Sequence, residues 1–492
     1  MTDKGLRHRA VSGMKWSMAG RLLKSGLGIV TLAVVSRYLS PAEFGTVALV
    51  MFITGFAQLF IDAGLRIALV QRETITELQK NTVFWGSLAN ALVLAGLVVV
   101  LAPQIAAAFD AEAVTPLVRW IAPIFPLAAL QGVSLTLLER RFDFARLAIS
   151  DFSSAVAGAL TAMALVVAGH GMAGLIAQQL VQALAGTLIL TAMARWRPSL
   201  RFSWTEYRSL ASYGGYVLLS GIVNFLNVNL SRPIVAGVIS APVLGHYTMA
   251  QQVVASPFRI IVSMARKVMF PILSSVQSDR QRVGTAYLTV QFAIMAVMAP
   301  ASLGVAAVTY PLTGLLLGPT WGPTAPLIQL VAIQILLSPI QETNQTVLAS
   351  LGHARFQFWW GLIAGGISTG GMWVAAHWGI EAAVLSRSVL MIVTIPALST
   401  YTMRQMDLRG WALAGALQGP MLAALVMFGA VFGLLEHLTL PDLAELAIGI
   451  PLGAALYVPL LFLLAPARTR DLRDTLLRRK RRAPAPGVAS SA

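Results

Sequence analysis

The chain has 492 residues, of which 57% are hydrophobic and only 11% are charged, with a formal net charge of +16. The charged share is well under the roughly 25% that is usual in soluble globular proteins. Apolar runs of about 20 residues recur along nearly the whole length, which excludes a soluble protein and predicts an all-α integral membrane protein. Cysteine is absent, which excludes disulfides, thiolate metal sites and a cysteine nucleophile.

The apolar runs predict about fourteen transmembrane helices, with boundary errors of a few residues. The predicted spans cover residues 12–38, 44–70, 82–108, 116–138, 147–169, 172–194, 209–238, 243–265, 284–310, 324–350, 356–377, 381–403, 410–435 and 444–466. The first run follows basic residues but is too long for a cleavable signal peptide.

Basic residues gather in alternate loops of this arrangement. Most of the 36 lysines and arginines lie in the N-terminus and in residues 71–81, 139–146, 195–208, 266–282, 351–355, 404–409 and 467–492. The opposite loops contain acidic residues and neither lysine nor arginine. By the positive-inside rule, both termini are cytoplasmic. The basic tail around Arg478–Arg482 is typical of a lipid-headgroup anchor, and no loop is long enough for a nucleic-acid-binding domain.

An internal repeat divides the chain. Leu39–Gly45 follows the first span and Ile239–Tyr247 follows the seventh, and a second pair of similar segments occurs in the same order at Arg141–Phe144 and Arg355–Phe358. Two six-helix lobes that insert the same way up form a parallel repeat. The predicted parts are the N-terminus 1–11, an N-lobe 12–194, a linker 195–208 that serves as a hinge, a C-lobe 209–403, two extra helices 410–466 and a tail 467–492.

Polar residues follow one face of the spans that the repeat relates to each other. They are Ser17, Arg21, Lys24 and Gly28 in span 1; Gln58, Asp62 and Arg66 in span 2; Ser220, Asn224, Asn227, Ser231 and Arg232 in span 7; and Gln252, Ser256, Arg259 and Ser263 in span 8. Steps of three and four keep such residues on one helix face. In lipid this face turns inward, either as contacts between helices or as the lining of a cavity.

The cations favour the cavity, because a charge within a bilayer needs water, protein or a counter-ion. Arg21, Lys24 and Arg259 are therefore predicted to bind an anion. Arg232 is a fourth candidate for the same role, or it gates the cavity or extends to the surface. Asp62 is predicted to pair with Arg66, with a coupling proton as the alternative. Glu342 in span 10 balances a cavity arginine, binds a coupling cation or reaches the interface.

Catalytic signatures are missing from the sequence. There is no P-loop, zinc-binding pattern or nucleophile motif. We expect a protein that is not an enzyme and that uses no cofactor or metal.

Three segments resemble the Wzx-type polysaccharide flippases of the multidrug/oligosaccharidyl-lipid/polysaccharide (MOP) superfamily: Arg37–Gly45, Asp62–Arg72 and Glu139–Phe144. The resemblance implies a V-shaped pair of lobes, like those of multidrug (MATE) transporters and lipid II flippases, in the bacterial inner membrane. It also implies an undecaprenyl-diphosphate-linked oligosaccharide as substrate, moved between leaflets by alternating access, with polysaccharide polymerase or export machinery as a partner.

Two other functions are weighed against this one. A cation-coupled drug antiporter of the same superfamily should favour an acidic cavity, which the basic stripes disfavour. A membrane-embedded glycan polymerase would need acids, bases or phosphate-binding groups in its outer loops, and the longest of these, residues 311–323, has no charged residue.

Overall fold

The computed structural model describes residues 20–62, 64–254, 258, 280–438 and 440–470, and the regular secondary structure within these ranges is helical. The chain forms two compact units. Unit 1 comprises Met1–Ser256, Leu316–Leu327 and Gly361–Ser386, and unit 2 comprises Pro257–Leu315, Ile328–Trp360 and Arg387–Ala492.

Within the described ranges, nine helices are long and apolar enough to cross a membrane, or ten if the bent pair Trp204–Ser212 and Val217–Asn229 forms one span. One of the nine, Phe144–Ala194, consists of two helices that pack against each other after a break near Gly169. The protein is therefore a multi-pass membrane protein, as predicted. The number of fourteen spans stays a prediction.

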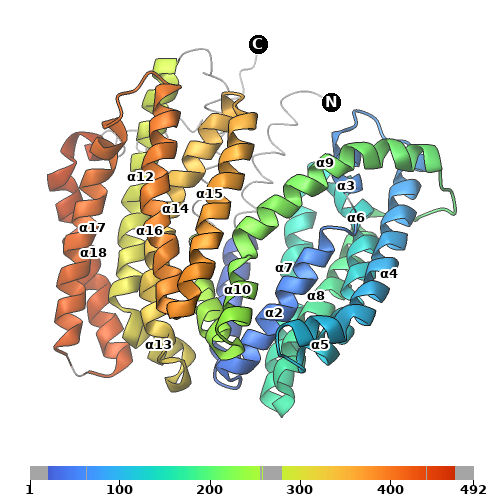
Figure 1. Cartoon of the computed structure of the whole chain (residues 1–492), viewed down its shortest axis with the longest axis horizontal. Helices are drawn as coiled ribbons and strands as arrows, with labels where there is room; N and C mark the ends of the chain where they lie inside the picture. Colours follow the sequence, from blue (N-terminus) through green and yellow to red (C-terminus); the bar gives the residue numbers. More distant parts are fainter. Residues whose placement is uncertain (1–19, 63, 255–257, 259–279, 439, 471–492) are drawn as a thin grey trace, which may run out of the picture. The chain divides into compact units, whose positions relative to one another are not determined.

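The helices of unit 1 come mainly from the first half of the chain (Figure 1). They are a helix of residues 20–35, α2 (Pro41–Gln58), α3 (Leu65–Gln71), α4 (Glu77–Ala108), α5 (Val114–Ile121), α6 (Ile124–Arg140), α7 (Phe144–Leu165), α8 (Gly171–Ala194), α9 (Trp204–Asn229), α10 (Ser231–Val238) and a helix of residues 241–254. The α7–α8 pair packs closely because small residues face each other, as at Gly158, which lies against the Gln178 carbonyl.

The start of α2 is fixed by a capping box. The Ser40 side chain accepts a hydrogen bond from the Glu43 backbone, and the Glu43 carboxylate accepts one from the Ser40 backbone at 2.8 Å. Pro41 occupies the first turn, where its missing N–H costs nothing. The motif that the repeat analysis singled out therefore sets the position at which α2 enters the bundle.

The second predicted span is broken between α2 and α3. Asp62 accepts a hydrogen bond from the Gly64 backbone at 3.0 Å, and Gly64 has a φ of +80° while its Cα faces the backbone of Gly214 in α9. A side chain at residue 64 would overlap that backbone. The carbonyl groups near the end of α3 receive hydrogen bonds from the Arg140 guanidinium, at 2.8 Å for Val70. These bonds satisfy backbone groups that lipid could not.

Unit 2 contains the remaining helices and the parts of α13 to α16 that belong to it. The helices are α12 (Arg280–Ala307), α13 (Thr309–Leu317), α14 (Thr324–Ser350), α15 (Ala354–Ala375), α16 (Ile380–Arg404), α17 (Ala412–Glu436) and α18 (Asp442–Leu464). Pro339 interrupts the hydrogen bonds of α14, and the Ser338 hydroxyl donates to the freed Ile335 carbonyl at 3.1 Å.

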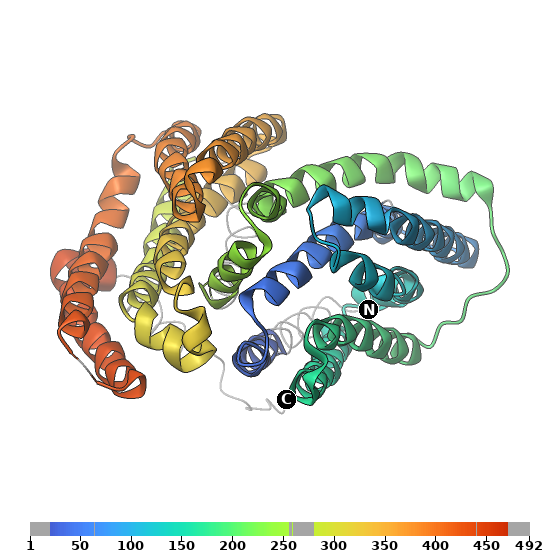
Figure 2. The same cartoon turned by 60° about the horizontal axis from the view of Figure 1, so that its bottom comes forward.

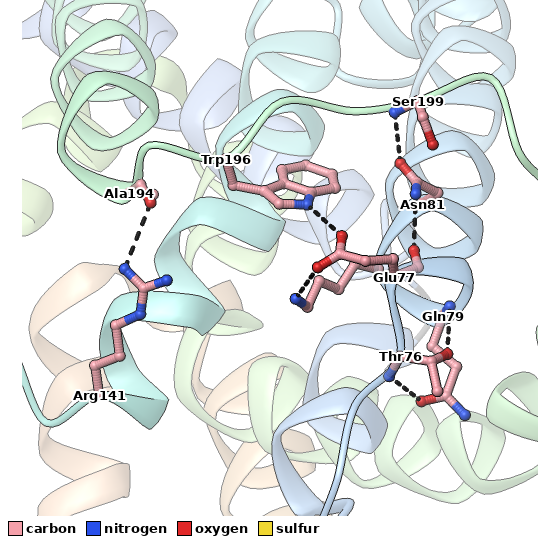
Figure 3. Close-up of polar contacts among 9 residues, drawn as sticks. Thr76, Glu77, Gln79, Asn81, Arg141, Ala194, Trp196 and Ser199 are labelled. Atoms are coloured by element: carbon pink, nitrogen blue, oxygen red, sulfur yellow. Dashed lines mark hydrogen bonds and ion pairs between the residues drawn. The ribbon is translucent and has the colours of Figure 1, made fainter.

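The linker between α8 and α9 runs alongside α4 in an extended form (Figure 2). Trp196 donates through its indole N–H to the Glu77 carboxylate at 3.1 Å, and the Ser199 backbone donates to the Asn81 carboxamide at 2.7 Å (Figure 3). Both acceptors lie in the first turns of α4. The segment predicted as a hinge is thus attached to one helix.

Two further hydrogen bonds continue this attachment along α4. The Trp85 indole donates to the Ser199 carbonyl at 2.8 Å, and the Ser203 backbone donates to the Thr82 hydroxyl at 3.1 Å. Any hinge motion in this region must either break these bonds or occur at another point, such as the 48° bend within α9.

Candidate functional site

A pocket of about 290 Å³, with a mixed polar and apolar lining, lies within unit 1. The helix of residues 20–35, the first turns of α2 and α8, α10 and the helix of residues 241–254 contribute to its wall. The lining residues are Gly28, Thr31, Leu32, Val35, Phe44, Val47, Ala48, Met51, Leu175, Gln178, Gln179, Arg232, Thr248 and Gln252. Helices from the predicted spans 1, 2, 7 and 8 therefore line one pocket, together with span 6, which was not predicted to contribute.

The polar lining consists largely of groups without a partner in the protein. Among the described residues, the carboxamides of Gln178, Gln179 and Gln252 have no hydrogen-bond partner. The Thr248 hydroxyl is unbonded as well, although the residue is only 3% exposed. The Thr31 hydroxyl donates to the Leu27 carbonyl at 2.8 Å. Thr248 is buried and the three glutamines are half-buried, and a polar group that is removed from water without a partner is costly, so these side chains are candidates for binding a ligand.

One side of the pocket ends at a compact aromatic contact. Phe44 lines the pocket and packs edge-on against Trp321, with the ring centroids 5.7 Å apart. Trp321 is fully buried, and its indole N–H donates to the Ser36 carbonyl at 2.8 Å. This contact joins the end of the first helix to the start of α2.

The two copies of the repeated motif meet beside the same aromatic contact. A side chain on Gly45 would overlap the Ala241 carbonyl, and a side chain on Gly245 would overlap the Pro41 carbonyl. Only hydrogen at both glycines allows the two helix starts to approach this closely.

The predicted cations occupy different surroundings. Arg232 lines the pocket and has an interaction partner. Lys24 forms an ion pair of 2.5 Å with Asp151 in α7. Arg21 is exposed and has no ion-pair partner within the described part of the chain. The predicted site residues Ser17, Ser256 and Arg259 lie outside the described residues.

The predicted pair Asp62–Arg66 is part of a larger cluster. The Arg66 Nε lies 3.7 Å from Asp62, while its Nη1 lies closer, at 3.0 Å, to the Glu139 carboxylate in α6. Two carboxylates share one cation here, with each side chain about one-third exposed. The cluster is separate from the pocket lining.

The polar residues of α9 and α10 do not all face the pocket. Asn227 donates to the Gly361 carbonyl of α15 at 3.3 Å, so it forms a contact between helices. Ser220 and Asn224 are exposed, and Ser231 is buried with an unbonded hydroxyl. Gln58, at the end of α2, is half-buried and lies outside the pocket lining.

Glu342 belongs to α14 in unit 2 and has an interaction partner. Its neighbour Asn344 is fully buried, accepts a hydrogen bond from Tyr287 at 2.9 Å and donates one to Ser399 at 2.8 Å. This buried network links α12, α14 and α16.

Metal-binding clusters are not found in the described ranges, where no three His, Asp or Glu side chains gather. Gln178 and Gln179 were not predicted as site residues. The signal that could have found them is the presence of Gln178, Gln179 and Gln182 in one apolar helix, where each carboxamide is costly.

Residues 34–326 match the family model described as polysaccharide biosynthesis protein, which covers more than half of the chain. The chain belongs to this family. This member of the polysaccharide biosynthesis protein family is 29% identical over 482 residues to the succinoglycan biosynthesis transport protein ExoT of Rhizobium meliloti (strain 1021), with 96% of this chain and 97% of that protein covered.

Two solved structures show the fold of this family member. The lipid II flippase MurJ in an inward closed conformation matches with a TM-score of 0.75 at 13% identity, covering 94% of this chain and 100% of that one. An inward-facing multidrug resistance MATE family transporter of the MOP superfamily matches with a TM-score of 0.60 at 15% identity, covering 81% and 98%. The predicted family and the all-α, MATE- and lipid II flippase-like fold class are confirmed.

Proposed function

We propose that this protein moves undecaprenyl-diphosphate-linked oligosaccharide repeat units from the cytoplasmic to the periplasmic leaflet of the bacterial inner membrane by alternating access. The product would serve the assembly of an exopolysaccharide, capsule or O-antigen. The observation that carries the proposal is a pocket inside a membrane-embedded unit, lined by three glutamines and a threonine hydroxyl that have no partner within the described residues, in a chain of the polysaccharide biosynthesis protein family. Its similarity to the named transport protein and to the flippase fold supports the same function.

The chemistry of the substrate explains why the protein needs both cations and neutral polar groups along the pathway. A lipid-linked diphosphate carries about two negative charges, which cannot cross hydrocarbon without cations or water. Arg21, Lys24, Arg232 and Arg259 are the proposed cations, since arginine forms bidentate contacts with phosphate and lysine acts as a point charge. Amides and hydroxyls along the pathway would replace water around the sugars, while the lipid tail stays in the bilayer.

The setting of the protein follows from the same proposal. Both termini would be cytoplasmic, the substrate would be delivered in the inner leaflet, and polysaccharide polymerase or export machinery would receive it outside. Asp62 and Glu342 are the proposed coupling-ion groups. The drug-antiporter alternative is disfavoured, because Arg232 is the single ionisable residue of the pocket lining and it is a cation.

Transport in proteoliposomes tests the proposal directly. The purified protein is reconstituted with the lipid-linked repeat unit of its host strain, labelled in the sugar, and the fraction exposed to an external glycosidase is followed with time. We expect translocation well above that of protein-free vesicles. Equal rates with and without the protein would contradict the proposed function.

A further inference from the structure

We infer that the pocket of unit 1 binds an uncharged sugar residue of the glycan through its hydroxyl groups, at a subsite distinct from Arg21, Lys24 and Arg259, which hold the diphosphate. Arg232 lines the pocket and is thereby assigned to the sugar subsite rather than to the diphosphate. The inference rests on the proposed function and assigns a part of the substrate to this pocket.

The donor set of the pocket fits hydroxyls better than phosphate. Gln178, Gln179 and Gln252 each offer two N–H donors and one carbonyl acceptor, and none of these carboxamides has a partner within the described residues. A sugar hydroxyl both donates and accepts, so it satisfies both ends of a carboxamide. A diphosphate only accepts at neutral pH and would leave the carbonyl oxygens unpaired.

The Thr248 hydroxyl points to the same ligand class. It has no hydrogen-bond partner although it is buried, and Thr248 lines the pocket. A threonine in a helix usually donates to the carbonyl one turn earlier, as Thr31 of the same pocket does. A hydroxyl that is buried but unbonded is free to pair with a polar group that enters the pocket.

The charge of the pocket also favours a neutral ligand. Arg232 is the one charged lining residue, and it already has an interaction partner. The groups of the pocket that remain unbonded are therefore neutral amides and hydroxyls. A diphosphate in this position would have about two negative charges facing them, without enough cations to offset its desolvation.

Size and position define how much of the glycan the pocket can take. Its volume of about 290 Å³ is at the lower end of the range of ligand pockets, roughly 300–1,000 Å³. The proposed phosphate-binding cation Arg21 lies on the same helix as Thr31, about 15 Å away along the axis at 1.5 Å per residue. A glycan that contacts Arg21 through its diphosphate therefore reaches the pocket with a sugar further along the chain.

The test compares two substrates that differ only in glycan length. One is the lipid-linked repeat unit of the host strain, and the other is the same lipid diphosphate trimmed to its first sugar by exoglycosidases. Gln178→Leu, Gln252→Leu and Thr248→Val remove pocket groups. Gln182→Leu, in the same helix α8 but outside the pocket lining, is the matched control.

We expect each pocket variant to lower the ratio of repeat-unit transport to trimmed-substrate transport by about fivefold or more, the effect of one lost hydrogen bond. The control should keep the wild-type ratio. Thr248→Val keeps the shape of the side chain and removes a hydroxyl without a protein partner, so folding is not at issue. An unchanged ratio in all three pocket variants, or an equal loss for both substrates, overturns the inference.

A binding measurement separates this inference from the proposed function. The repeat unit released from its lipid by mild acid is titrated calorimetrically into the wild-type protein and the pocket variants. Binding that the pocket variants lose and Gln182→Leu retains supports the sugar subsite even if the wild-type protein transports neither lipid-linked substrate. No binding to the wild-type protein contradicts the subsite, whatever the transport assay shows.

Discussion

Single charged residues in this membrane protein differ in how fully their charge is balanced. Arg66 is shared by two carboxylates, and Lys24 has one partner, Asp151. Because an ammonium carries three donors, one ion pair leaves Lys24 with donors for a phosphate oxygen. Lys24 can therefore be paired and still bind substrate.

Substitutions at Lys24 and Asp151 test whether Lys24 binds the substrate or serves only to neutralise Asp151. Exposed ion pairs contribute about 0–1 kcal/mol to stability, and the two side chains are 38% and 54% exposed. We expect Asp151→Asn to retain glycan export and thermal stability, and Lys24→Met to lower export at least about tenfold. Export of the capsule or exopolysaccharide and the melting temperature in detergent are the measurements.

The double variant Lys24→Met with Asp151→Asn supplies the control. If Lys24 acts on the substrate, the double variant exports as poorly as Lys24→Met alone. Recovery of export in the double variant would mean that Lys24 serves only to neutralise Asp151.

At the scale of helices and their connections, the main feature is the attachment of the linker to α4. Four hydrogen bonds to Glu77, Asn81, Thr82 and Trp85 hold an extended segment that has no helix or sheet of its own, and Figure 3 shows those to Glu77 and Asn81. The linker therefore moves together with α4. Because the linker ends at the first residue of α9, a displacement of α4 would also displace the start of α9.

Loss of one of these bonds should loosen the linker locally. Asn81→Ala removes the acceptor for the Ser199 backbone, a contribution of about 1 kcal/mol. The loss of this bond raises the fraction of molecules in which the linker has detached from α4 about fivefold. The cleavage rate is proportional to that fraction when the linker reattaches faster than the protease cuts it. The measurement is the rate of trypsin cleavage at the exposed Arg195 and Arg201.

Ser87→Ala is the matched control for this experiment. Ser87 lies in the same helix α4 and is buried, but its hydroxyl has no partner among the described residues. Its cleavage rate should match that of the wild type. If Asn81→Ala is cleaved at the same rate as Ser87→Ala, the bond between Asn81 and Ser199 does not stabilise the linker.

The sequence predicted the helical membrane class because apolar runs alone decide it. It also predicted a shared cavity of spans 1, 2, 7 and 8, and Arg232 and Gln252 from the polar stripes line the pocket. Asn227, from the same stripes, instead contacts Gly361. Periodicity indicates which residues share a helix face, but the neighbour that this face meets depends on packing between distant segments.

At the scale of the whole molecule, the orientation in the membrane is the property to establish. Because the chain has no cysteine, single cysteines can be placed without removing native ones. Leu200 is 91% exposed in the linker, and Glu112 lies in a loop predicted on the opposite side.

Labelling with a membrane-impermeant maleimide measures that orientation. By the positive-inside rule, Leu200→Cys should react in inside-out vesicles and stay unlabelled in intact spheroplasts. Glu112→Cys should show the reverse. Three predicted spans separate the two positions, so they should lie on opposite sides of the membrane. Labelling of both positions from the same side would mean an even number of spans between them and would contradict the predicted topology.

The close approach of Gly45 and Gly245 has a consequence for the symmetry of the chain. Gly45 faces the Ala241 carbonyl, and Gly245 faces the Pro41 carbonyl, so each copy of the motif contacts the other through equivalent atoms. This reciprocity is the mark of an isologous interface, the kind that two identical subunits form around a two-fold axis. Within the single polypeptide, the two segments thus meet as two identical subunits would meet in an isologous dimer.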